Sequence, residues 1–97
     1  MTYSAHPDAE RDVEIASDFY RDRAGVLLAL KFVAEVDRIA KLVDCNPEAG
    51  APLTHGRRMF HRKTFPYTLV YRPQPGGIQV LVVRHQHQKP GYGMRRG

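Results

Sequence analysis

The stretch between Gly25 and Asn46 restricts the possible folds most, because it is helical in pattern and apolar around much of its circumference. Large apolar side chains recur every three or four residues, and smaller ones widen the stripe. They are Leu28, Phe32, Val36, Ile39 and Val43, with Ala29, Val33 and Ala40. A stripe of this width has to be buried against a second layer of structure. Asn46-Pro47 ends the helix, because a residue before proline avoids the helical region.

A second, shorter helix is predicted over residues 7–22. Pro7 suits a first helical position, and Asp8 and Glu10 lie where the helix dipole favours negative charge. Apolar residues then recur at helical spacing, namely Ala9, Val13, Ala16 and Tyr20, with Phe19 beside them. Because only a short link around Gly25 separates the two helices, we expect an antiparallel helical hairpin over about residues 7–45.

Three strand-like runs follow the helices. They cover residues 59–65, 67–72 and 78–85, while 1–5 is a short strand candidate, 46–56 a loop, 73–77 a turn and 86–97 a tail. The last strand is apolar on both faces, so we expect it to be central. The sequence therefore predicts one α+β domain over residues 1–97, in the order strand, helix, helix, strand, strand, strand. The helical hairpin packs on one face of a mainly antiparallel sheet at about 57–85.

Charge is divided sharply along the chain. All ten carboxylates lie between Asp8 and Glu48, whereas residues 57–97 carry nine Lys or Arg side chains and no carboxylate. A basic segment of this kind is attracted to phosphate or to an acidic protein. We expect the sheet face away from the helices to be left to solvent or a partner and to carry much of this charge.

Several classes of protein are disfavoured by what the sequence lacks. Cys45 is the only cysteine, so no internal disulfide forms, and no Cys–His cluster predicts a metal site. We expect neither a metal nor another cofactor. No apolar run approaches the ~18–20 residues that span a membrane, and no signal-peptide pattern opens the chain. The expected location is therefore the cytoplasm.

Four motifs occur in an order that is similar to a known family. They are His6-Pro7-Asp8-Ala9-Glu10, then Asn46-Pro47-Glu48-Ala49-Gly50 with Pro52, then Phe65-Pro66-Tyr67 with Leu69-Val70-Tyr71-Arg72, and last His85-Gln86 with Lys89-Pro90-Gly91-Tyr92. Over about residues 3–92 the chain resembles the ParE-like branch of the RelE/ParE toxin superfamily, also known as plasmid stabilisation proteins.

The resemblance implies the toxin of a type II toxin–antitoxin system, held inactive in a heteromeric complex with a cognate antitoxin. It leaves the target open between DNA gyrase, as for ParE-type members, and the ribosome, where RelE-type members cut mRNA. The closing motif follows the ParE-like pattern, so our leading hypothesis is growth arrest by gyrase inhibition. The alternatives are a metal-independent, ribosome-dependent mRNA endonuclease, and a non-toxic basic module that binds nucleic acid.

The residues predicted to bind antitoxin or target are the cations of the sheet half. They are Arg57, Arg58, Arg62, Lys63, Arg72, Arg84 and Lys89. We expect the antitoxin to cover the helix pair and one open sheet edge, because an unpaired edge invites strand addition.

If the chain is a ribonuclease, its candidate catalytic residues are Arg84, His85, Arg62 and Tyr92. Strand alternation puts Arg84 and His85 on opposite faces, which weakens a simple catalytic cluster. We therefore expect His85 to form structural hydrogen bonds and Tyr92 to pack against the sheet. Tyr67 and Tyr71 are expected in the core.

Overall fold

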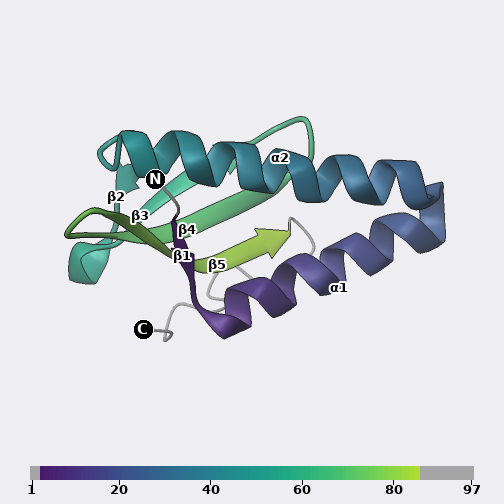
Figure 1. Ribbon diagram of the computed structural model, residues 1–97, viewed down its shortest axis with the longest axis horizontal. Coiled ribbons are helices and arrows are strands. Elements are labelled where there is room, and N and C mark those ends of the chain that lie inside the picture. Colours follow the sequence, from purple (N-terminus) through teal and green to yellow (C-terminus); the bar gives the residue numbers. More distant parts are fainter. Residues whose placement is uncertain (1–2, 86–97) are drawn as a thin grey trace.

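The computed structural model describes residues 3–85, in which two helices cover one face of a five-stranded sheet (Figure 1). The predicted α+β fold is confirmed. Its elements are β1 (Ser4–Ala5), α1 (Pro7–Ala24), α2 (Val26–Cys45), β2 (Ala51–Pro52), the 3₁₀ helix η1 (Thr54–Gly56), β3 (Arg58–Arg62), β4 (Tyr67–Gln74) and β5 (Gly77–His85).

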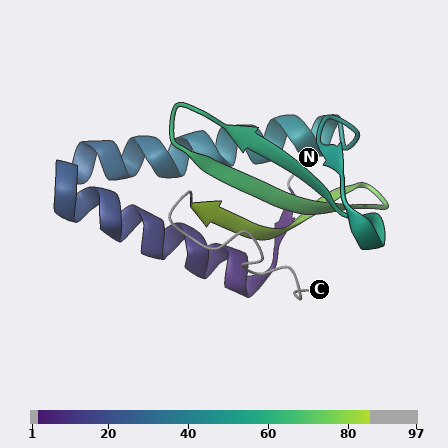
Figure 2. The same cartoon turned by 180° about the vertical axis from the view of Figure 1, so that it is seen from behind.

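The sheet is mixed, with strand order β1-β5-β4-β3-β2. β1 runs parallel to β5, and every other neighbouring pair is antiparallel. β5 therefore has a partner on each side, as its apolar sequence predicted. The view from behind shows the face of the sheet that the helices leave uncovered (Figure 2).

Local sequence explains where the helices begin and end. The His6 imidazole accepts a hydrogen bond from the Asp8 N–H at 3.0 Å, and Pro7 occupies the first turn of α1. Gly25 alone links the two helices. Its backbone φ is 96°, a value that residues other than glycine rarely adopt. α1 and α2 diverge from this link, so their far ends lie further apart near β1 (Figure 1).

The main core lies between the helices and the sheet. Its largest fully buried members are Tyr71, Phe32, Ile39, Leu69, Ile78 and Val43. At the end nearer Gly25, Tyr20, Phe32, Phe65 and Tyr67 pack ring against ring, with centroids 5.1–5.8 Å apart. Tyr67 and Tyr71 are buried, which confirms their predicted place in the core.

Each helix is also joined to β5 by a buried aspartate. Asp12 of α1 accepts the backbone N–H of Val83 at 3.0 Å, and Asp44 of α2 accepts that of Ile78 at 3.0 Å. Both carboxylates satisfy strand N–H groups that would otherwise be buried without a partner. The helix layer is thus attached to the sheet by directed bonds as well as by apolar contact.

Several predicted boundaries are wrong, since α1 continues to Ala24 rather than ending at residue 22, and β4 continues to Gln74 rather than ending at residue 72. β3 ends at Arg62 rather than at residue 65, because residues 63–66 form the turn into β4. Phe65 is buried all the same, since it folds back onto the aromatic core from that turn. The predicted loop 46–56 contains β2 and η1, and β2 extends the sheet by pairing with β3.

The prediction for the uncovered face of the sheet is also wrong in part. Its centre is apolar and buried, formed by Val70, Leu81 and Val82, with Leu53 and Met59 packed against them. An irregular register puts Val70 opposite Val82 and Tyr71 opposite Val80, so Leu81 is the extra residue of a β-bulge. Two successive β5 side chains thereby join this second cluster.

Candidate functional site

The basic residues predicted to bind a partner are spread over both sides of the sheet. Arg58 and Arg62 lie opposite buried core tyrosines of β4, so both are on the helix-facing side. Arg72 lies on the other side and donates a hydrogen bond to Gln79 at 2.8 Å. Of the remaining cations, Arg84 shares the side of Arg72, Lys63 is exposed in the β3–β4 turn, Arg57 is half-buried before β3, and Lys89 lies outside the described residues.

Arg62 has an acidic partner from the helix layer. Its guanidinium lies 3.4 Å from the Glu35 carboxylate of α2, although no carboxylate is near it in sequence. Arg38 also donates two hydrogen bonds to Glu35, at 3.0 and 3.2 Å. The hydrogen bonding from Arg38 is the main reason that the pKa of Glu35 is lowered; burial opposes the shift, and the Arg62 charge adds to it. Arg62 therefore connects β3 to α2.

Arg58 holds the loop that follows α2. Its guanidinium donates to the carbonyl oxygens of Glu48 at 3.3 Å and Gly50 at 2.7 Å. The Tyr71 hydroxyl donates to the carbonyl of Pro47 at 2.7 Å and accepts the Gly50 N–H at 2.8 Å. Burial raises the pKa of Tyr71, so its hydroxyl stays protonated and able to donate. Arg58 thus has a structural role.

The three candidate catalytic residues that the structure describes do not form one cluster. Arg62 and His85 flank Tyr67 in a cross-strand row on the helix-facing side. His85 Nε2 lies 2.9 Å from the Tyr20 hydroxyl, so the end of β5 is hydrogen-bonded to α1. Arg84 is on the opposite side of the sheet, as strand alternation predicted. The fourth candidate, Tyr92, lies outside the described residues.

A polar row crosses the uncovered face, and Arg84 is its one member that was among the predicted site residues. His61 of β3, Thr68 of β4 and Arg84 of β5 are direct cross-strand neighbours. The Thr68 hydroxyl lies 2.6 Å from His61 Nδ1, which fixes the orientation of the exposed imidazole. Only the strand register brings these residues together, so no sequence spacing indicated the row.

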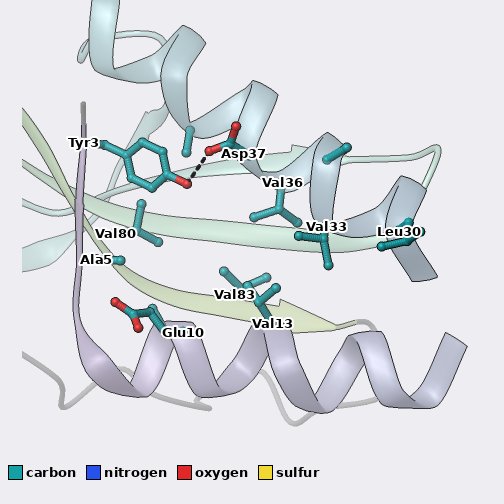
Figure 3. Close-up of a pocket in the computed structure, with 13 residues that line it drawn as sticks. Tyr3, Ala5, Glu10, Val13, Leu30, Val33, Val36, Asp37, Val80 and Val83 are labelled. Atoms are coloured by element: carbon teal, nitrogen blue, oxygen red, sulfur yellow. Dashed lines mark hydrogen bonds between the residues drawn. The ribbon is translucent and has the colours of Figure 1, made fainter. Parts of the chain in front are cut away.

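An apolar groove lies between the helices, on the side of the molecule away from the row. One cavity of about 450 Å³ is floored by Val80 and Val83 of β5 and walled by both helices and β1 (Figure 3). A second cavity of about 410 Å³ shares Val13 and Val33 with the first and continues along α1 past Glu14, Ser17 and Asp18. We call the two cavities together the interhelical groove.

The α2 wall of the groove is apolar and open to solvent. Leu30 is 60% exposed and Val33 39% exposed, and Leu27, one turn before Leu30, is 76% exposed. Val33 is therefore exposed rather than part of the buried stripe in which it was predicted, and no surface role was predicted for the two leucines. The signal was present, because Leu27, Leu30 and Val33 form a second helical line beside the buried one. Adjacent exposed apolar side chains of this size are typical of an interaction surface.

Tyr3 and Asp37 close one end of the groove (Figure 3). The Tyr3 hydroxyl donates to Asp37 at 2.8 Å, and Lys41 lies 2.9 Å from the other Asp37 oxygen. Burial is the main cause that raises the pKa of Tyr3 to about 12, and the bond to Asp37 adds to it. The hydrogen bond from Lys41 is the main cause of a lowered pKa for Asp37.

Across residues 3–85, His, Cys, Asp and Glu side chains form no group arranged to hold a metal ion. Neither α1 nor α2, nor any other helix in that range, is long and apolar enough to cross a membrane.

Comparison with known proteins identifies the family. Residues 3–90 match the family described as "ParE toxin of type II toxin-antitoxin system, parDE". The chain is 31% identical over 85 residues to Toxin ParE2 of Mycobacterium tuberculosis strain ATCC 25618 / H37Rv, and equally to that of strain CDC 1551 / Oshkosh, covering 88% of this chain and 81% of each relative. A chain in the solved structure "Chromosomal ParDE TA system from P. aeruginosa" superposes with a TM-score of 0.76 at 25% identity, over 88% of this chain and 95% of that one. Since the family match spans nearly the whole sequence, we conclude that this chain belongs to the ParE toxin family of type II toxin–antitoxin systems.

Proposed function

We propose that this toxin arrests growth by binding DNA gyrase, without cutting RNA, and that a cognate antitoxin holds it inactive in a heteromeric complex in the cytoplasm. The observation that carries the proposal is the separation of the candidate catalytic residues. Arg62 and His85 bind Glu35 and Tyr20 within the fold, while Arg84 is on the opposite side of the sheet. General acid–base catalysis requires its groups around one reacting centre, which this arrangement does not offer.

The antitoxin would use two surfaces of the toxin. The first is the interhelical groove together with the exposed α2 surface beside it, where covering Leu30 of the groove and Leu27 next to it would stabilise a complex by about 1–2 kcal/mol for each side chain. The second is the outer edge of β3, because among the described residues β2 pairs only with Arg58 and Met59 and leaves residues 60–62 unpaired. An antitoxin strand added there would satisfy those backbone groups. The opposite edge is less available, since Asp12 already accepts the Val83 N–H.

The target is tested by ordering events after induction. Plasmid supercoiling and amino-acid incorporation are followed in the same culture, and purified toxin is added to gyrase and to a translating extract. We expect supercoiling to fail first and purified toxin to inhibit gyrase, with both effects relieved by the antitoxin encoded beside the toxin gene. Translation that stops before supercoiling changes, with gyrase unaffected, would refute the proposed target.

The antitoxin surfaces are tested by amide hydrogen exchange. Exchange should slow at residues 60–64 and along residues 25–45 when antitoxin binds, because both regions become covered. Unchanged exchange in both regions would remove the two-surface arrangement while leaving the target experiment intact.

Messenger RNA cleavage is kept as a second candidate because of the row on the uncovered face. A histidine oriented by Thr68, with an arginine on the far side of that threonine, could supply a proton-transfer group and a cation to one phosphate-containing substrate that spans the three strands. If the toxin cuts RNA, His61→Ala should abolish ribosome-associated cleavage. If the toxin binds gyrase as proposed, His61→Ala should produce no change in RNA integrity, because the unsubstituted toxin cuts none.

A further inference from the structure

We infer that the segment occupying the interhelical groove is a cationic amphipathic helix of the antitoxin, with Lys or Arg side chains about four residues apart along one flank of an apolar stripe. The inference rests on the proposed antitoxin partnership and adds the chemistry of the segment that binds. It follows from the unequal walls of the groove and from the charges that line it.

The floor and the α2 wall require an apolar stripe on the partner. Val80 and Val83 form the floor, and Leu30 and Val33 face solvent along α2. A helix that presents apolar residues three and four positions apart fills such a groove. A polar or fully charged partner segment would bury its own polar groups against these apolar side chains, where they would find no hydrogen-bond partner.

The α1 wall requires positive charge. Glu10, Glu14 and Asp18 line the groove at four-residue spacing, so they form one row along the helix. Within residues 3–85 Glu10 and Glu14 have no cationic partner, and Asp18 pairs only with the exposed Arg21 of its own helix. No Lys or Arg of the described residues lines either cavity. The toxin as a whole is basic, so this local excess of negative charge is opposite in sign to the rest of the molecule.

The spacing and the walls both favour a helix over a strand. The row from Glu10 to Asp18 spans about 12 Å at a rise of ~1.5 Å per residue, which a partner helix matches with cations at successive four-residue steps. The apolar floor and the acidic wall of the groove are adjacent, and a partner helix can present an apolar stripe and a cationic stripe side by side. A strand would place its cations opposite its apolar side chains. A strand would also leave its N–H and C=O groups unpaired, because helical walls offer no free backbone partners.

The test measures binding of the purified antitoxin encoded beside the gene to full-length toxin variants. The first variant is Glu10→Gln/Glu14→Gln, and the second is Leu30→Ser. The matched control is Asp22→Asn, an exposed carboxylate on α1 that lines neither cavity. Dissociation constants are measured at low and high NaCl, and thermal melting of each free variant checks that it is folded.

We expect the double variant to bind roughly ten-fold more weakly at low salt, at about two- to five-fold for each lost ion pair, with a weaker salt dependence. Leu30→Ser should weaken binding at both salt concentrations, and Asp22→Asn should bind like the unsubstituted toxin. An antitoxin segment bearing basic residues, changed to Gln at those positions, should reproduce the loss.

Each contrary result has one meaning. Failure of the unsubstituted toxin to bind the antitoxin would refute the proposed partnership itself. Normal binding by both groove variants would overturn the inference while the partnership stands. Loss with Leu30→Ser alone would overturn the cationic assignment. Self-association of the free toxin that Leu30→Ser abolishes, with antitoxin binding unchanged, would overturn it in favour of a second copy of the chain.

Discussion

Two buried tyrosines on β4 give a sharp test of the hydrogen bonding described above. Tyr71 is fully buried, and its hydroxyl bonds both the Gly50 N–H and the Pro47 carbonyl. Tyr67 lies four residues earlier on the same face and is buried too, but its hydroxyl has no hydrogen-bond partner within residues 3–85. Changing each tyrosine to phenylalanine removes one oxygen atom from almost the same environment. The two changes should nevertheless have different effects on stability.

Tyr71→Phe should destabilise the fold by about 2–3 kcal/mol, because the buried Gly50 N–H loses its partner and the half-buried Pro47 carbonyl is left to water. Tyr67→Phe should be neutral or stabilising by up to about 1 kcal/mol, since a buried hydroxyl without a partner carries a desolvation cost. Burial, the main cause that raises the pKa of Tyr67, reflects the same apolar environment.

Urea unfolding followed by circular dichroism measures both changes. With an m-value of about 1–1.5 kcal/mol/M, Tyr71→Phe should lower the midpoint by about 2 M, and Tyr67→Phe should leave it unchanged or raise it. Amide exchange at Gly50 should accelerate in Tyr71→Phe alone. Equal losses of stability in the two variants would refute the reasoning, because they would show that hydroxyl partners do not decide the outcome.

Three further predictions concern other contacts. Gly77→Ala should destabilise by about 1–3 kcal/mol in thermal melting, because the added methyl would overlap the Asp44 carboxylate; an unchanged midpoint would contradict this. The raised pKa of Tyr3, about 12, means that the folded state holds the proton more tightly than the unfolded state, so Tyr3 should contribute a loss of stability of roughly 1 kcal/mol between pH 10 and 12 after allowance for solvent screening. Tyr3→Phe should remove that share of the pH dependence, while Tyr20, Tyr67 and Tyr71, whose pKa values are also raised, keep theirs. A double-mutant cycle of Arg62→Ala and Glu35→Gln should give a coupling of about 0.5–1 kcal/mol in urea, and strict additivity would show that the pair contributes nothing.

The sequence predicted those parts of the fold that are set by local patterns. The wide stripe of α2 required burial against a sheet, Gly25 indicated the hairpin, and the apolar run of β5 indicated a central strand. β2 could not be found this way, because two residues that include Pro52 carry no periodic signal. Its pairing with Met59 and Arg58 depends on a loop that long-range hydrogen bonds hold in place.

The candidate site was less predictable, because acidic and basic residues that lie in different segments of the sequence come together in the fold. Arg62 lies in a basic segment, yet folding places it against Glu35, 27 residues earlier. The row of His61 and Arg84 likewise depends on register across three strands. The interhelical groove depends on how far two helices diverge, which single-helix periodicity does not describe. For such sites the sequence identifies the residues, but only the folded structure shows which residues become neighbours.

The position of β5 in the sheet has a consequence for how the toxin is made. It is the last strand along the described chain, yet it lies between β1 and β4, and Ser4 of β1 pairs with Gln79 some 75 positions later. A chain emerging from the ribosome therefore cannot assemble this sheet until its final strand has been released. Translation products that end before β5 lack the central strand and with it the floor of the groove, so they cannot acquire the toxin's shape.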